Sequence, residues 1–228
     1  VAADPAAHAG NSGLAAYDAR QFDYEVVRYD GGPGNFQGQG YVGVRGAWMK
    51  TDSAGVLAHE LAHNLGLWHA NAWSPNEPAT IVGPGRNVDY GDVFDTMGRN
   101  SGAHWHLNAW EKHALGWIDT DAIVTVGTGT TIETISAHDL GTPSQAGEAR
   151  ALRFVGDDGR ELWAELRRHP DWSGNRWLGN GLSLRWAPWS GSGGGTQLLD
   201  ANPDTAEGFV DAPLTIGRSF SDTGRDVH

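Results

Sequence analysis

The residues best suited to chemistry lie in one short stretch, HELAHNLGLWH, which covers residues 59–69. His59 and His63 are four positions apart, so on a helix their imidazoles project from the same face and can hold one metal ion. Gly66 permits a sharp turn, because glycine adopts positive φ without steric cost, and this turn returns His69 to the same ion. Three imidazole ligands that leave a fourth position open are typical of a catalytic rather than a structural zinc site.

Glu60 follows the first of these histidines directly and is the acid–base candidate of the stretch. A carboxylate beside a catalytic metal is placed to take a proton from a water molecule that the metal activates. A purely structural zinc site has no need of such a carboxylate. The spacing of the histidines, the glutamate and the glycine therefore predicts a hydrolytic metal centre with Glu60 as its general base.

The elements that must position these residues follow from periodicity and turn residues. Apolar residues at helical spacing predict a helix over residues 53–66, which ends at a glycine. A second helix is expected over residues 108–116, because Asn108 and Glu111 have the spacing of a capping box. Residues 31–46 form a Gly-rich loop, and a loop of this length inside a compact domain is typically functional or close to a site.

Strand-like segments lie on both sides of these helices. Before the first helix, residues 22–29, 41–44 and 47–50 are rich in β-branched and aromatic residues. Residues 70–105 show little regular pattern. After Trp117, strand-like segments separated by turn residues cover residues 122–126, 131–137, 151–155, 161–167, 182–186 and 196–200. We expect an α+β fold with a catalytic domain over residues 1–117 and an antiparallel all-β, sandwich-like domain over residues 118–228.

Composition excludes several classes of function. The chain has 28 acidic against 16 basic residues, a net charge of −12, and this charge repels phosphate backbones, so no nucleic-acid partner is expected. The absence of cysteine excludes cysteine zinc sites, thiol nucleophiles and disulfide scaffolds. No apolar run approaches the length of a transmembrane helix, so no membrane partner is expected either.

The extended histidine pattern is the signature of the metzincin metallopeptidases, which this chain resembles. The runs HELAHNLGLWHA, YGDVFDTMG and NAWEKHALGW look like the gametolysin-type metzincins and, less closely, like the immune inhibitor A group. The close resemblance covers about residues 36–118. It implies zinc bound by His59, His63 and His69, and Glu60 as base. It also implies that Met97, in the sequence DTMG, is the methionine turn beneath the metal.

The resemblance also implies a function and a location. It suggests a secreted endopeptidase that hydrolyses peptide bonds of extracellular proteins or glycoproteins, with the first helix at the floor of the substrate cleft. Gly98 and Arg99 follow Met97, so the tyrosine that serves some metzincins as an extra metal ligand is missing at that place. The ligands implied for this chain are therefore three histidines and water.

Weaker signals leave alternatives open. Asp89, Asp92 and Asp95 suit an oxygen-ligand set for calcium, but Asp-rich loops are common without a metal. Asp95 suits a hydrogen bond near the histidines as well. His104 and His106 suit the ligands of a second metal or, as we favour, the polar lining of a cleft wall or a surface loop.

Two features bear on ligands other than metals. An extended peptide binds most easily by adding a strand to an exposed sheet edge, and residues 41–44 are our candidate for that edge. Tryptophans crowd the second half of the chain, at Trp163, Trp172, Trp177, Trp186 and Trp189. They suit packing, which we favour, or platforms that stack on sugars. The competing function is therefore a non-catalytic, zinc-stabilised, Trp-rich module that binds glycans.

Overall fold

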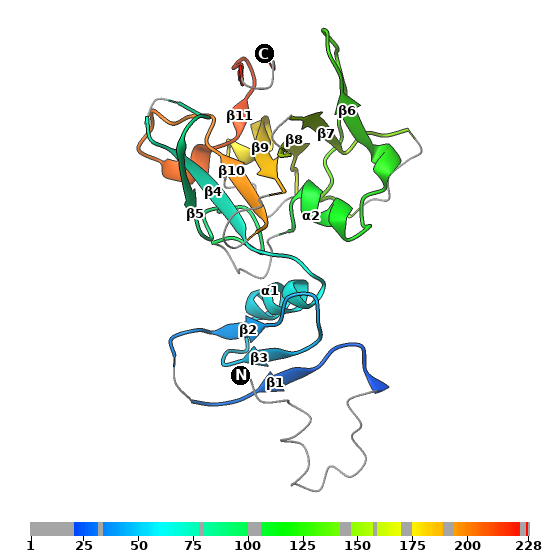
Figure 1. The fold of residues 1–228 in the computed structure, drawn as a ribbon, viewed down its shortest axis with the longest axis vertical. Helices are drawn as coiled ribbons and strands as arrows, with labels where there is room; N and C mark the ends of the chain where they lie inside the picture. The colour runs from blue at the N-terminus through cyan, green and yellow to red at the C-terminus, as the bar shows by residue number, and fades with distance from the viewer. Residues whose placement is uncertain are drawn as a thin grey trace, which may run out of the picture. The chain divides into compact units, whose positions relative to one another are not determined.

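The computed structural model describes residues 21–31, 34–77, 80–99, 106–141, 147–156, 159–169, 175–188, 194–223 and 227 (Figure 1). Within these ranges the chain is α+β, as the sequence predicts. The described residues form two compact units, which divide between Leu67 and Trp68. The domain boundary expected between residues 117 and 118 lies within the second unit. No helix of the described part is both long and apolar enough to cross a membrane.

The first unit contains a small sheet covered by helix α1 (Ala54–Asn64), as Figure 1 shows. Strand β3 (Ala47–Met49) is central; it pairs in parallel with β1 (Val26–Arg28) and antiparallel with β2 (Gly38–Gly40). The predicted helix and the predicted strand over residues 47–50 are thus confirmed. Residues 41–44 are not a strand, so β2 takes the place of that segment as an edge of this sheet.

Side-chain and backbone caps fix both ends of α1. The Ser53 hydroxyl accepts a hydrogen bond from the Val56 N–H (3.4 Å), which satisfies one of the first N–H groups of the helix. At the other end, Gly66 has a φ of 100°, and its N–H donates to the His63 carbonyl (2.8 Å). The N–H of Leu67 donates to Ala62 (3.1 Å), which completes a Schellman motif. The glycine therefore ends the helix and turns the chain, as predicted.

The second unit is built on one eight-stranded sheet. Its strands are β4 (Ala70–Pro75), β5 (Gly85–Val88), β6 (Ile123–Val126), β7 (Ala151–Val155), β8 (Glu161–Leu166), β9 (Gly181–Ala187), β10 (Thr196–Leu199) and β11 (Leu214–Thr215). Their order in space is β5-β4-β10-β9-β8-β7-β6, and β11 pairs with β9. Helix α2 (Ala109–Ala114) contacts β8, and Asn108 and Glu111 form the predicted capping box.

This sheet differs from the expected antiparallel sandwich. It is mixed, since β10 pairs in parallel with β4 and β6 pairs in parallel with β7. The described strands of the second unit form a single sheet rather than two. Residues 131–137 contribute only an isolated bridge at Ile135. Strands β4 and β5 come from the stretch in which the sequence showed no pattern, because Asn, Ser, Pro and Gly interrupt their alternation.

Apolar side chains cover both faces of the central strands. Leu162 and Ala164 of β8 belong to one cluster with Trp186, whereas Trp163 between them belongs to another with Ile123. Alternation along a strand places successive side chains on opposite faces, so both clusters draw on the same strand. Trp163 and Trp186 are 3% and 2% exposed, which confirms the packing interpretation for these two residues.

Trp177 is the third of these five tryptophans that the structure describes. Trp177 is half-buried, and the Arg176 guanidinium lies over its ring, 4.5 Å from the centroid. Trp172 and Trp189 lie outside the described residues.

Candidate metal centre

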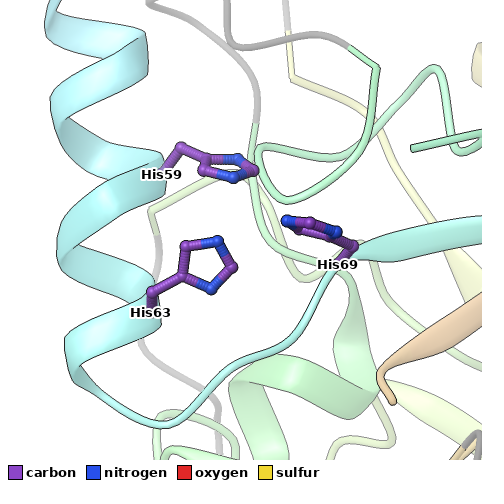
Figure 2. Close-up of side chains that lie close together, drawn as sticks. All are labelled: His59, His63 and His69. Carbon is purple, nitrogen blue, oxygen red and sulfur yellow. The ribbon is translucent and has the colours of Figure 1, made fainter. Parts of the chain in front are cut away.

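Three imidazoles, two from α1 and one from the segment that follows it, face one another (Figure 2). One ring nitrogen from each of His59, His63 and His69 lies within 4.8 Å of the others. His59 and His63 come from successive turns of α1, and their ring centroids are 4.8 Å apart in an edge-to-face arrangement. His69 directly precedes β4. The predicted gathering of these three side chains is confirmed.

Hydrogen bonds donated by Nδ1 fix the tautomers of two of these histidines. The Nδ1 of His63 donates to the Leu67 carbonyl (2.8 Å), and the Nδ1 of His69 donates to an Asp89 carboxylate oxygen (3.3 Å). Each ring thereby carries its lone pair on Nε2. Burial lowers the pKa of His63, which favours the neutral, metal-binding form, although the bond to Leu67 acts in the opposite direction. A set of neutral imidazole donors suits Zn²⁺, so these residues fit the expected metal.

Glu60 lies buried against the glycine strand β2. A Cβ atom on Gly38 would lie 2.6 Å from the Glu60 Oε1, and one on Gly40 would collide with the Glu60 carbonyl. The N–H of Gly40 donates to the Glu60 carboxylate. Burial raises the pKa of Glu60 to about 7, against the opposing effect of that hydrogen bond. The Gly-rich loop thus lies at the candidate site, as predicted, and supplies the strand that holds the carboxylate.

Asn64, the last residue of α1, ties the helix to the loop before β3. Its amide donates to the carbonyls of Tyr41 (2.9 Å) and Gly46 (3.0 Å), and its Oδ1 accepts from the Gly46 N–H (3.1 Å). The N–H of Gly43 donates to the His63 carbonyl (2.9 Å). Residues 41–46 therefore brace the end of the helix that carries His63, a role that sequence reasoning missed.

Met97 lies in a buried turn joined to the segment that carries His69. Its carbonyl accepts from the N–H of Ala70 (2.9 Å), and its own N–H donates to the Asp95 carboxylate (2.8 Å). Asp92 accepts from the N–H of Phe94 (2.9 Å) and so closes the preceding turn. Met97 is fully buried, as its predicted place requires. Its role beneath a metal stays a prediction from the resemblance.

Two buried arginines anchor this turn from the sheet. Arg185 donates to Asp92 (2.7 Å) and to Glu165 (2.6 Å), and Arg167 donates to the carbonyls of Phe94 (2.7 Å) and His106 (3.0 Å). Neither arginine was predicted to have this role, although the sequence carries a signal for it. An arginine inside an apolar strand needs buried acceptors, because a buried charge without a partner is costly.

The aspartates considered for calcium have separate partners. Asp89 contacts His69, Asp92 contacts Arg185, and Asp95 accepts from the backbone N–H groups of Met97 and Asn108. In the described part of the chain, the histidine cluster is the one group of three close metal-ligating side chains. The three aspartates form no such group, which favours the alternative of an Asp-rich loop without a metal; calcium binding itself stays untested.

The predicted HxH pair can be followed at one of its two members. His106 is half-buried, and burial, followed by the charge of Lys112, lowers its pKa to about 4. It belongs to no described group of three ligands. His104 lies outside the described residues, so the role of the pair stays a prediction.

The chain was compared with protein-family models, with curated proteins and with solved structures. None of the three comparisons found a match. Any function proposed for the chain therefore rests on its own residues and geometry.

Proposed function

We propose that the chain is a zinc-dependent endopeptidase of metzincin type. The observation that carries the proposal is the gathering of His59, His63 and His69 around one position, with Glu60 adjacent to the first of them in α1. The hydrogen bonds of His63 and His69 support it, because they leave Nε2 as the metal-binding nitrogen. The open fourth position of such a site is what a catalytic zinc requires.

Glu60 carries the proton transfers of the proposed reaction. Zn²⁺ held by the three imidazoles would supply Lewis-acid polarisation of a peptide carbonyl and lower the pKa of water toward about 7. The Glu60 carboxylate accepts a proton from the attacking water and, once protonated, donates it to the departing amine. The Gly40 N–H holds this carboxylate, which supports a fixed position for the base.

Strand β2 is the proposed place for the peptide. It is an edge strand of its sheet and lies on α1 at Glu60, so a substrate pairing with it would pass close to the base. Backbone pairing suits any extended polypeptide and fixes no side-chain preference. The metzincin resemblance supports extracellular proteins or glycoproteins as substrates, and secretion of the enzyme.

The structure gives little support to the competing function, a glycan-binding module. Trp163 and Trp186 are packed in the core and present no face to a sugar. A module stabilised by zinc also has no use for a buried carboxylate beside the ligands. The buried tryptophans therefore give no support to this second function.

The test combines peptide hydrolysis with metal analysis. Glu60→Gln keeps the shape of the side chain but cannot accept the proton, so hydrolysis of casein should fall by about two to four orders of magnitude. Zinc should stay at one ion per chain, whereas His63→Ala should lose it. Glu207→Gln, a change at an exposed glutamate, is the control and should behave as wild type.

Each result bears on one part of the proposal. Near wild-type hydrolysis by Glu60→Gln would show that another group is the base. A wild-type protein that binds zinc yet cleaves no peptide would refute the peptidase. Absence of zinc after reconstitution would refute the metal centre itself.

A further inference from the structure

His69 differs from the other two ligands because it lies outside the helix, where regular backbone does not orient its ring. We propose that Asp89 and Tyr90 are positioning residues that set the tautomer and the ring orientation of His69. This inference rests on the proposed zinc site. It assigns the side chains that give the third ligand its binding geometry.

Asp89 acts on the edge of the imidazole. Its carboxylate accepts from the His69 Nδ1 at 3.3 Å, and the remaining nitrogen then carries the lone pair. A carboxylate in this place makes a histidine a better ligand, and the loss of such a partner typically weakens metal binding by about 10- to 100-fold. The Asp89 side chain is 62% exposed, so the backbone around it has to hold it in place.

Tyr90 acts on the face of the same imidazole. The two ring centroids are 3.8 Å apart, with the planes tilted by 35°. Among the described residues, Tyr90 is the one non-glycine with a positive φ, at 56°. In an extended strand, consecutive side chains point to opposite faces. Here the left-handed turn follows the end of β5, and Asp89 and Tyr90 both contact His69, one at its edge and one at its face.

A buried amide holds this arrangement together. The Asn71 side chain is fully buried; it donates to the carbonyls of His69 (3.3 Å) and Gly194 (3.2 Å) and accepts from the Tyr90 N–H (3.1 Å). One side chain therefore joins the backbone of the ligand to the backbone of the strained residue. A strained backbone persists where the surroundings over-determine it, and such places cluster at functional sites.

Tyrosine at position 90 indicates a role at the candidate metal site rather than a role in folding. Folding alone would favour glycine at this φ, because a side chain is strained there. Tyrosine keeps the strain and adds a ring that stacks on His69. The ring therefore supports His69, although the tyrosine backbone is strained. Replacing Tyr90 with glycine should weaken metal binding but should not lower stability.

The experiment measures zinc affinity, by competition with a chromophoric chelator, and urea unfolding of the metal-free protein. Asp89→Ala should weaken zinc binding about 10- to 100-fold, whereas Asp204→Ala, at another exposed aspartate, should leave it unchanged. Tyr90→Gly should weaken zinc binding by about tenfold while its unfolding midpoint stays at or above that of wild type. Tyr90→Phe keeps the ring and should restore the wild-type affinity.

The outcomes distinguish this inference from the proposed function. If the wild-type protein binds one zinc and both Asp89→Ala and Tyr90→Gly bind it within twofold of wild type, the positioning role is refuted and the zinc site stands. If Tyr90→Gly loses affinity and stability together, Tyr90 serves the fold alone and the inference fails. If the wild-type protein binds no zinc, the proposed function fails and this inference with it.

Discussion

Arg185 should be among the most costly residues to replace in the second unit. It is 1% exposed, and its guanidinium joins Asp92, at the start of the turn that contains Met97, to Glu165 of β8. Arg185→Met keeps most of the volume but removes the charge. Two carboxylate oxygens would then be left in the core without their cation.

The size of the effect follows from these two contacts. A hydrogen bond to a charged group is worth about 1.5–3 kcal/mol, so two give about 3–6 kcal/mol. Asp92 keeps the Phe94 N–H, and Arg167 lies 4.0 Å from Glu165, so part of the compensation remains. Removing one partner of a buried ion pair typically costs about 3–5 kcal/mol, and we expect a loss in this range.

The loss of stability in Arg185→Met should depend on pH. Burial alone would raise the pKa of Glu165, but Arg185 and then His138 outweigh it and hold this pKa well below its usual range. Removing Arg185 removes the largest of the effects that lower this pKa, so the folded carboxyl of the variant binds a proton at a higher pH than that of the wild type. The extra protonation stabilises the folded variant relative to the folded wild type, so the difference in their free energies of unfolding should narrow as the pH falls from 7 to 5.

Urea unfolding at pH 7 and pH 5 measures both effects. Arg153→Met on β7 is the matched control, because Arg153 is 29% exposed and lies 3.8 Å from Glu161. A partly exposed pair of this kind is worth about 0–1 kcal/mol. A loss below about 1 kcal/mol for Arg185→Met, or equal losses for both variants, would refute the idea that this ion pair stabilises the turn.

Two further predictions concern β2 and a half-buried acid, Asp200. Gly38→Ala brings a methyl group against the Glu60 carboxylate, so hydrolysis should fall while zinc stays bound. Gly179→Ala is the control, because a Cβ atom there meets nothing within 4 Å. Equal rates of hydrolysis for the two variants would contradict the assigned role of β2. Burial raises the pKa of Asp200 to about 6, against the opposing hydrogen bond from Asn202, so its charge destabilises the fold increasingly as the pH rises from about 4 to 6. Asp200→Asn should therefore raise the free energy of unfolding by about 1 kcal/mol at pH 8, after allowance for solvent screening, and leave it unchanged at pH 4; an equal gain at both would show that the charge is not the cause.

Features decided by local interactions could be predicted from the sequence. The caps of both helices are of this kind. Ser53 caps the start of α1 and Gly66 ends it, and Asn108 and Glu111 form the capping box of α2. The central strands of the second unit were also predicted within a residue or two, because burial on both faces makes them apolar runs bounded by turns.

Features decided by distant partners could not be predicted. Strand β4 has the sequence ANAWSP, which has weak strand character of its own, and it forms because β5 and β10 pair with it on either side. The parallel pairings of β10 with β4 and of β6 with β7 make the sheet mixed, a property that no local pattern encodes. The partners of Asp92 and Asp95, Arg185 and Asn108 among them, likewise come from distant parts of the chain and could not be predicted from the sequence.

The residues of the candidate site also differ in whether local or distant interactions determine their placement. His59 and His63 follow from helix periodicity, and the turn at Gly66 is encoded within a few residues. The orientation of His69 depends on Asp89, 20 positions away, and on Asn71, which also reaches across 123 positions to Gly194. A chain with the same histidines but without these partners would still match the motif, yet its third ligand would lack a fixed tautomer and ring plane. Zinc affinity in this chain is therefore expected to depend on residues that the motif does not contain.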